Sequence, residues 1–166
     1  VTTTTLTGSR QVREALGDRV LHVYAPYDLP GAVRRFLRRT RPRLAVIMET
    51  ELWPNLLRRC AAEGIPVVIA NARLSERSAR GYRRIRGMTA AMLGDVALIA
   101  AQADADAERF RALGAPRVQM IGNLKYDLAL PDDLPERGRQ LRRELLGEKR
   151  LVWIAASTHA GEEEQV

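Results

Sequence analysis

Two carboxylates lie close together where an apolar run gives way to a proline. Glu49 and Glu51 follow the run that ends at Met48, and Pro54 opens the next helical segment. Carboxylates at the end of a strand suit acid/base or electrostatic catalysis. The alternative is structural, because acidic side chains in the first turn of a helix favour its macrodipole and proline is tolerated there. Of the two, Glu49 is nearer the strand end, which favours it as the residue that faces a cleft.

A second set of polar side chains follows the next apolar run. Asn71 and Arg73 come directly after that run. The guanidinium fork of arginine matches phosphates and carboxylates, so the pair is a candidate site for an anionic or sugar substrate. Asparagine is also common in turns, and Ser75 is a suitable helix N-cap, so these residues could equally serve the loop alone. Both readings stay open at the level of the sequence.

Lys125 also follows an apolar run and precedes a proline-containing segment. A lysine at a junction between domains could stabilise a leaving phosphate by opposing its charge. The alternative is a solvated surface lysine, which is the usual place for this side chain.

A turn near the end of the chain carries Ser157, Thr158 and His159. A strand-to-helix turn of this kind is a candidate anion site through its backbone N–H groups. It lacks the Gly-rich signature of a phosphate-binding loop. The acidic residues that follow, Glu162 and Glu163, are also explained by pairing with the helix dipole.

Arginine dominates the charge of the chain. The net charge is +7, from 27 basic and 20 acidic residues, and it implies anionic partners. Two amphipathic arginine-rich stretches suit an anionic membrane surface, although a solvated helix face is the alternative. No recognised nucleic-acid-binding module accompanies them, so we expect no nucleic-acid partner. The arginines are Arg34, Arg35, Arg38, Arg39, Arg41 and Arg43 in the first stretch, and Arg77, Arg80, Arg83, Arg84 and Arg86 in the second.

Short apolar runs and amphipathic stretches alternate along the chain and predict about seven βα units. Continuous apolar strands are typical of a parallel sheet with helices on both faces. We therefore expect an α/β protein with a Rossmann-like, doubly wound parallel sheet and functional residues at the carboxyl ends of its strands. The expected strands are 1–5, 20–24, 44–48, 67–70, 96–100, 118–121 and 151–155. The expected helices are 9–16, 30–39, 54–63, 76–93 with an interruption near Gly87, 105–113, 135–146 and a last one from 161.

Prolines and acidic residues between 128 and 138 predict a linker, because proline blocks helix and central-strand continuation. We expect residues 1–128 to form an N-terminal domain that is truncated at its start. Residues 129–166 are then a linker helix and the beginning of a second domain. The chain begins within an expected strand and stops in the first turns of an expected helix, so both ends are interpreted as truncations.

Other features of the composition limit the classes of function. Cys60 is the single cysteine, so no intrachain disulfide can form, and we expect it to be a small packing residue. Cysteine and histidine are too few and too far apart for a metal-ligand cluster. No apolar segment approaches the roughly 18 uninterrupted residues of a membrane-spanning helix.

The polar strings, taken together and in order, resemble the bacterial 3-deoxy-D-manno-octulosonic acid (Kdo) transferases. The resemblance covers nearly the whole chain. Departures are small: Leu6 stands where the family often has proline, and Arg10 and Ala160 stand where it often has glutamate. The strings that carry the resemblance are residues 3–9, 24–30, 48–55 (METELWPN), 69–75 (IANARLS), 81–82, 99–102 (IAAQ), 122–127, 156–159 and 161–163.

The resemblance implies a GT-B glycosyltransferase, in which two Rossmann-like domains face a cleft. The implied reaction is an inverting, metal-independent transfer of Kdo from CMP-Kdo to the lipid A precursor lipid IVA, in lipopolysaccharide biosynthesis and without a cofactor. Glu49 and Lys125 match residues to which the family assigns transition-state stabilisation. The general base is implied to be a glutamate upstream of residue 1, and the CMP-binding strings lie beyond residue 166. We therefore expect the fragment alone to be inactive.

The implied location is the cytoplasmic face of the inner membrane, reached peripherally or through a single anchor. Asn71, Arg73, Ser157, Thr158 and His159 remain candidate substrate-binding residues. One alternative is another GT-B enzyme, such as lipid-A-disaccharide synthase or a sugar epimerase, and the METELWPN and NARLS strings argue against it. The other alternative is a non-catalytic α/β module that docks on a membrane or a nucleic acid.

Overall fold

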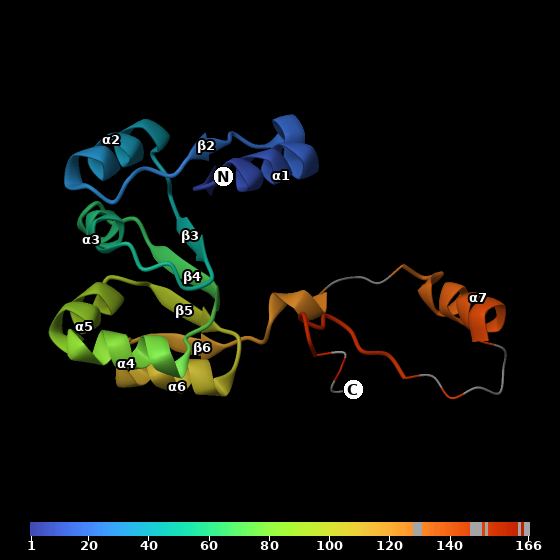
Figure 1. Cartoon of the computed structure of the whole chain (residues 1–166). Coiled ribbons are helices and arrows are strands. Elements are labelled where there is room, and N and C mark those ends of the chain that lie inside the picture. The colour runs from blue at the N-terminus through green and yellow to red at the C-terminus, as the bar shows by residue number, and fades with distance from the viewer. Residues whose placement is uncertain (128–130, 147–150, 152, 163, 165–166) are drawn as a thin grey trace. The chain divides into compact units, whose positions relative to one another are not determined.

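A computed structural model describes residues 1–127, 131–146, 151, 153–162 and 164 of the chain (Figure 1). These residues divide into two compact units, Val1–Asp127 and Leu128–Val166. The boundary falls next to the expected one after residue 128. The assignment of the second unit to another domain of a GT-B enzyme stays a prediction.

A four-stranded parallel sheet forms the centre of the first unit. Its strands are β3 (Ala45–Met48), β4 (Val67–Ala72), β5 (Leu98–Ala101) and β6 (Val118–Met120), in the order β3-β4-β5-β6. They are apolar runs, and their side chains meet in register, with Ile47 beside Ile69 and Ile69 beside Ile99. The predicted α/β class and the parallel, Rossmann-like sheet with flanking helices are confirmed.

The first two predicted strands are shorter than expected and form a sheet of their own. β1 (Thr2–Thr3) pairs in parallel with β2 (Val23–Tyr24). A 3-10 turn, η1 (Gly17–Arg19), occupies the chain just before the expected start of the second strand. A cavity of about 520 Å³ lies between the residues of β1 and those of β3. Among the described residues the sheet is therefore divided, where a single sheet was expected.

Six helices connect these strands, and local capping explains several of their starts. α1 begins three residues earlier than predicted, because the Thr5 hydroxyl caps it by accepting from the Gly8 N–H at 3.1 Å. The predicted helix over 76–93 is two helices, which meet at Ile85 rather than at Gly87. The helices are α1 (Leu6–Leu16), α2 (Pro30–Thr40), α3 (Pro54–Ala62), α4 (Glu76–Arg84), α5 (Arg86–Gly94) and α6 (Asp104–Ala112).

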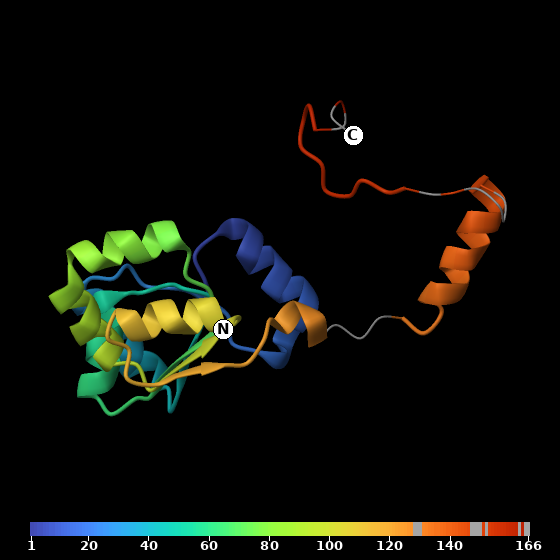
Figure 2. The same ribbon diagram turned by 90° about the horizontal axis from the view of Figure 1, so that it is seen from below.

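The core of this unit lies between one face of the sheet and the helices. Leu57, Ile69, Leu93, Ile99 and Phe110 are all at most 1% exposed there. In both views α4 and α6 lie on the same side of the sheet (Figure 1 and Figure 2).

The opposite face is less covered than the apolar strands predict. Val46 and Met48 of β3 are 54% and 52% exposed. The expectation of helices over both faces therefore does not hold at β3 within the described part of the chain.

The second unit holds one helix, α7 (Leu134–Leu146), among its described residues. The helix starts inside the segment predicted as a linker, so any linker there is shorter than residues 128–138. The predicted strand 151–155 is wrong for its described residues, which belong to no strand or sheet. Leu151, Trp153 and Ile154 are at least 70% exposed, and a strand without a neighbour has no ladder to hold it. Residues 160–162 form a turn, and the rest of the predicted last helix lies largely outside the described residues.

No helix in the described part of the chain has both the length and the apolar character needed to cross a membrane.

Cys60 offers a direct test of the packing. Its thiol is fully buried on α3, and burial, followed by the negative charge of Glu63, raises its pKa. Because the thiolate is the reactive form, the folded chain should react with a thiol reagent about 100-fold more slowly than the chain in denaturant at the same pH. Stopped-flow absorbance with Ellman's reagent measures both rates. Equal rates would contradict the packing of α3 against the sheet.

Candidate functional site

The carboxyl ends of the four parallel strands bring the polar segments of the first unit to one edge of the sheet. Glu49 follows β3, Gln102 follows β5, and Lys125 lies in η2 (Leu124–Asp127), which follows β6. Asn71 and Arg73 lie at and just after the end of β4. Parallel strands make this convergence automatic, because all of them point the same way.

Glu49 leaves β3 in an unusual backbone conformation. Its φ is 60°, in the left-handed region that non-glycine residues seldom adopt. Its N–H donates to the Ala70 carbonyl of β4 at 2.8 Å, so the sheet holds the turn in place. The Glu49 side chain is exposed. Strained residues of this kind concentrate at functional sites.

Asn71 joins the end of β4 to the segment that carries Lys125. A β-bulge lies here, because three residue steps of β4, from Ile69 to Ala72, match two steps of β5. Asn71 has a φ of 53° and is only 7% exposed. Its side-chain oxygen accepts from the Leu124 N–H at 3.2 Å, and its backbone carbonyl accepts from the Gln102 side chain at 2.9 Å. Asn71 therefore helps to hold this edge in position, and its role in substrate binding stays a prediction.

Residues 73–75, here named the Arg73 loop, follow at once. The Arg73 N–H donates to the Thr50 hydroxyl at 3.0 Å, and this hydroxyl donates back to the Arg73 carbonyl. The Leu74 side chain is buried in the core. Ser75 caps α4 by accepting from the Ser78 N–H at 3.1 Å. The backbone of the loop is thus fixed, while the Arg73 side chain is exposed and no hydrogen bond or ion pair joins it to another described residue.

Glu49 and Arg73 line the same cavity, which has a volume of about 310 Å³. Its other lining residues are Leu74 and four residues that carry hydroxyl groups, Thr50, Ser75, Ser78 and Tyr82. A guanidinium with several hydroxyls suits an anionic or sugar ligand.

Lys125 is exposed, and its own N–H donates to the Asn123 side chain at 3.0 Å. The link from Leu124 to Asn71 therefore fixes the position of its backbone. Of the predicted residues, Glu49, Asn71, Arg73 and Lys125 lie at one edge of one unit.

Ser157, Thr158 and His159 belong to the second unit. Ser157 has a φ of 60°. The His159 N–H donates to the Glu162 carboxylate at 2.8 Å, and the Glu162 N–H donates to the His159 carbonyl at 3.0 Å. Glu162 therefore takes up one of the backbone donors that were candidates for binding an anion, and the role of the turn stays a prediction.

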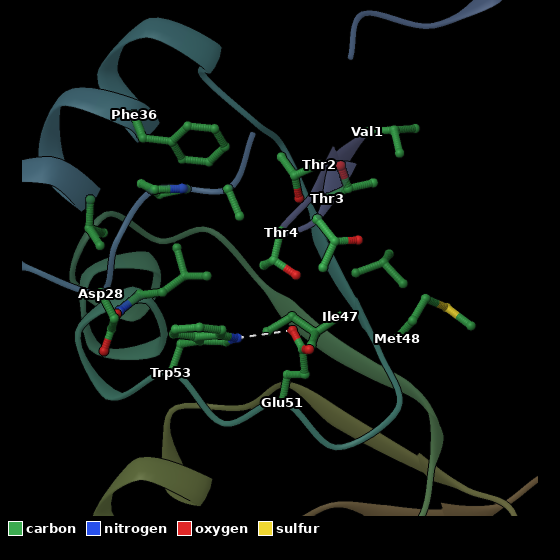
Figure 3. A pocket seen from close by; sticks show the side chains of 16 residues that line it. Val1, Thr2, Thr3, Thr4, Asp28, Phe36, Ile47, Met48, Glu51 and Trp53 are labelled. Carbon is green, nitrogen blue, oxygen red and sulfur yellow. Dashed lines mark hydrogen bonds between the residues drawn. The ribbon is translucent and has the colours of Figure 1, made fainter. Parts of the chain in front are cut away.

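Glu51 faces the larger cavity, between β1 and β3 (Figure 3). Its carboxylate accepts from the Trp53 indole N–H at 3.2 Å, and the hydroxyl-bearing residues Thr4 and Thr5 line the same space. The two carboxylates of the METE string thus line different cavities.

In the part of the chain that the structure describes, no three His, Cys, Asp or Glu residues cluster as metal ligands would. The metal independence implied by the resemblance stays a prediction.

Comparisons with known proteins agree on one family. The family model described as 3-deoxy-D-manno-octulosonic-acid transferase (kdotransferase) matches residues 1–128. A 3-deoxy-D-manno-octulosonic acid transferase of Haemophilus influenzae is 46% identical over 165 residues, which cover 98% of this chain and 38% of that protein. A probable mitochondrial one of Arabidopsis thaliana is 36% identical over 173 residues, covering 100% of this chain and 38% of that protein.

A third relative, a bifunctional glycosyltransferase/methyltransferase of Fusobacterium nucleatum, is 32% identical over 144 residues, or 86% of this chain and 22% of that protein. This chain therefore spans well under half the length of the curated relatives that it matches. The family model covers most of the chain, and its match ends beside the boundary between the two units. The chain belongs to the 3-deoxy-D-manno-octulosonic acid transferase family.

Proposed function

We propose that the intact protein is an inverting glycosyltransferase that moves Kdo from CMP-Kdo to the lipid A precursor lipid IVA in lipopolysaccharide biosynthesis. Family membership supports the Kdo chemistry. The observation that carries the proposal to particular residues is the shared cavity of Glu49 and Arg73, at the sheet edge that also bears Lys125. In an open α/β sheet, ligands bind outside the carboxyl ends of the strands.

The proposed step is a displacement at the anomeric carbon of Kdo. An acceptor hydroxyl oxygen forms the new bond, and the bond from the anomeric carbon to the CMP phosphate breaks, with its electron pair leaving on CMP. The hydroxyl proton passes to a general base, a glutamate that the resemblance places outside these 166 residues. No metal ion or cofactor takes part in the proposal.

Lys125 and Glu49 have complementary proposed roles in this step. The departing phosphate gains negative charge, and the Lys125 ammonium opposes it most strongly when the cleft excludes water. The Glu49 carboxylate opposes positive charge that develops at the anomeric carbon, or it orients the acceptor hydroxyl. The Arg73 guanidinium, without an ion pair to another described residue, is proposed to bind an anionic group of a substrate.

The arginine-rich helices support a membrane location for the same reaction. On α2, Arg34, Arg35, Arg38 and Arg39 are all exposed, and none forms an ion pair with a described acidic residue. Tyr27 and Leu29, just before α2, are 85% and 62% exposed. Uncompensated charge beside exposed apolar side chains favours an anionic bilayer surface. We propose the cytoplasmic face of the inner membrane as that surface.

Glu49→Gln and Lys125→Ala in the intact transferase are each expected to lower kcat by about 10²–10³-fold, because each removes charge that opposes charge in the transition state. Release of CMP from CMP-Kdo in the presence of lipid IVA measures the rate. Glu14→Gln, an exposed glutamate on α1 away from the strand ends, is the control and should keep the wild-type rate. Wild-type turnover in both test variants would contradict the catalytic roles proposed for Glu49 and Lys125.

Replacement of all four α2 arginines by glutamine is expected to weaken binding of the chain to anionic vesicles by about 10²–10³-fold, since each basic side chain near the surface contributes about 1 kcal/mol. Co-sedimentation with phosphatidylglycerol-containing vesicles, compared with pure phosphatidylcholine, measures the effect.

The matched control for this experiment is Arg139→Gln with Arg143→Gln on α7. Both guanidiniums bond to Glu136, at 2.7 and 3.2 Å, and hold the pKa of that carboxyl below its usual value. Because their charge already has a partner, their loss should change binding little. Equal losses per arginine removed in the two variants would mean that net charge alone drives binding, and would contradict a docking role for α2.

A further inference from the structure

We propose that Asp106 and Arg109 of α6 are positioning residues that hold the Arg73 loop in the conformation that binds an anionic group of a substrate. The proposal rests on the proposed function in one respect, that the Arg73 side chain contacts substrate. Asp106 and Arg109 lie more than 30 positions along the chain from the loop that they contact.

The contacts between α6 and the loop are made to the backbone of one residue, Leu74. The Asp106 carboxylate accepts from the Leu74 N–H at 2.8 Å. The Arg109 guanidinium donates to the Leu74 carbonyl at 3.0 Å and to Asp106 at 3.4 Å. Side chains of α6 thus satisfy both polar groups of the Leu74 backbone. Because Leu74 lies between β4 and α4, neither a ladder nor a helix supplies these partners.

Burial makes the arrangement informative. Asp106 is 8% exposed, and its neighbours Ala107 and Phe110 are fully buried. A carboxylate in such a place is costly unless it is paired and hydrogen-bonded, so packing alone does not explain it. Favourable interaction with the helix dipole does not explain it either, because Asp104 shares the first turn of α6 and remains exposed, without a hydrogen bond or ion pair to the loop.

The geometry connects this pair to the cavity. Leu74 points into the core, and its neighbours Arg73 and Ser75 line the cavity with Glu49. Thr50, which follows β3, bonds to the backbone of Arg73, and the α6 pair bonds to the backbone of Leu74. With the backbone held on both sides, the base of the Arg73 side chain has a fixed position. Loss of the α6 contacts frees that position and weakens the grip of Arg73 on an anion.

A double-mutant cycle on the intact transferase tests the inference, with KM and kcat measured for the acceptor and for CMP-Kdo separately. Arg73→Gln is expected to raise one of the two KM values about 10–100-fold, which also identifies the substrate that carries the anion. Asp106→Asn is expected to raise the same KM about 10-fold, with a smaller change in kcat. In the Arg73→Gln background, Asp106→Asn should raise it no further, because it acts through Arg73.

Two control variants separate positioning from general stability. Asp104→Asn, in the same helical turn, should leave KM at the wild-type value. Arg117→Gln removes a guanidinium that also donates to backbone carbonyls, of Ala97 at 2.7 Å and Val96 at 3.4 Å, but at the amino end of β5. It should lower the melting temperature without changing KM. If Asp106→Asn does not fold, Arg109→Lys replaces it, since lysine keeps the charge but loses the fork that reaches Leu74.

Additive effects of Arg73→Gln and Asp106→Asn on KM overturn the inference and leave the proposed function intact. A KM that no variant changes overturns both the inference and the role of Arg73. If the intact protein transfers no Kdo, the proposed function fails. The phosphate affinity of each variant in the same cycle is then measured on the 166-residue chain, from the NMR shift of the Arg73 Nε–H. Equal phosphate affinity in wild type and Asp106→Asn then overturns the inference on its own.

Discussion

The backbone of β4 leaves its sheet while it is still buried, and the rest of the site depends on how its polar groups are satisfied. From Asn71 onward the β ladder no longer supplies all the partners, and buried N–H and C=O groups without partners are costly. Side chains supply them instead: Gln102 bonds to the Asn71 carbonyl, Thr50 to the Arg73 backbone, and the α6 pair to Leu74. One strand end is thereby tied to the ends of both neighbouring strands. The cavity that holds Glu49 follows from these bonds.

The repeated apolar runs were sufficient to predict the parallel sheet, because strands that are apolar along their whole length are typical of a parallel sheet covered by helices. They were insufficient to predict its division into two. Strand pairing joins segments that are far apart in the sequence, and the residue pattern of β1 does not show which strand it pairs with. The run 151–155 has a strand-like composition, yet its described residues have no partner strand. Composition reports what a segment can bury, whereas a strand exists only beside another strand.

The site was predictable to the extent that it lies at strand ends. The rule that functional side chains follow the strands of an α/β sheet predicted that Glu49, Asn71, Arg73 and Lys125 share one edge, while their roles stay predictions. The supporting side chains were missed. Asp106 resembles any acidic residue at a helix start, and its contact to Leu74 depends on a packing that the sequence does not display. The contact of the Asn71 side-chain oxygen with the Leu124 N–H of η2 was missed for the same reason, and a role of Asn71 in substrate binding stays a prediction.

The held backbone of the Arg73 loop has a consequence for the entropy of ligand binding. Ordering a flexible segment costs about 1–2 kcal/mol per residue in backbone entropy, and a floppy three-residue loop would lose that amount each time a ligand bound. Here the ordering takes place once, when α6 folds against the end of β4. What remains free is the Arg73 side chain, so a ligand needs to restrict only a few side-chain rotations. A loop that is already ordered therefore binds a ligand more tightly than a flexible loop that makes the same contacts.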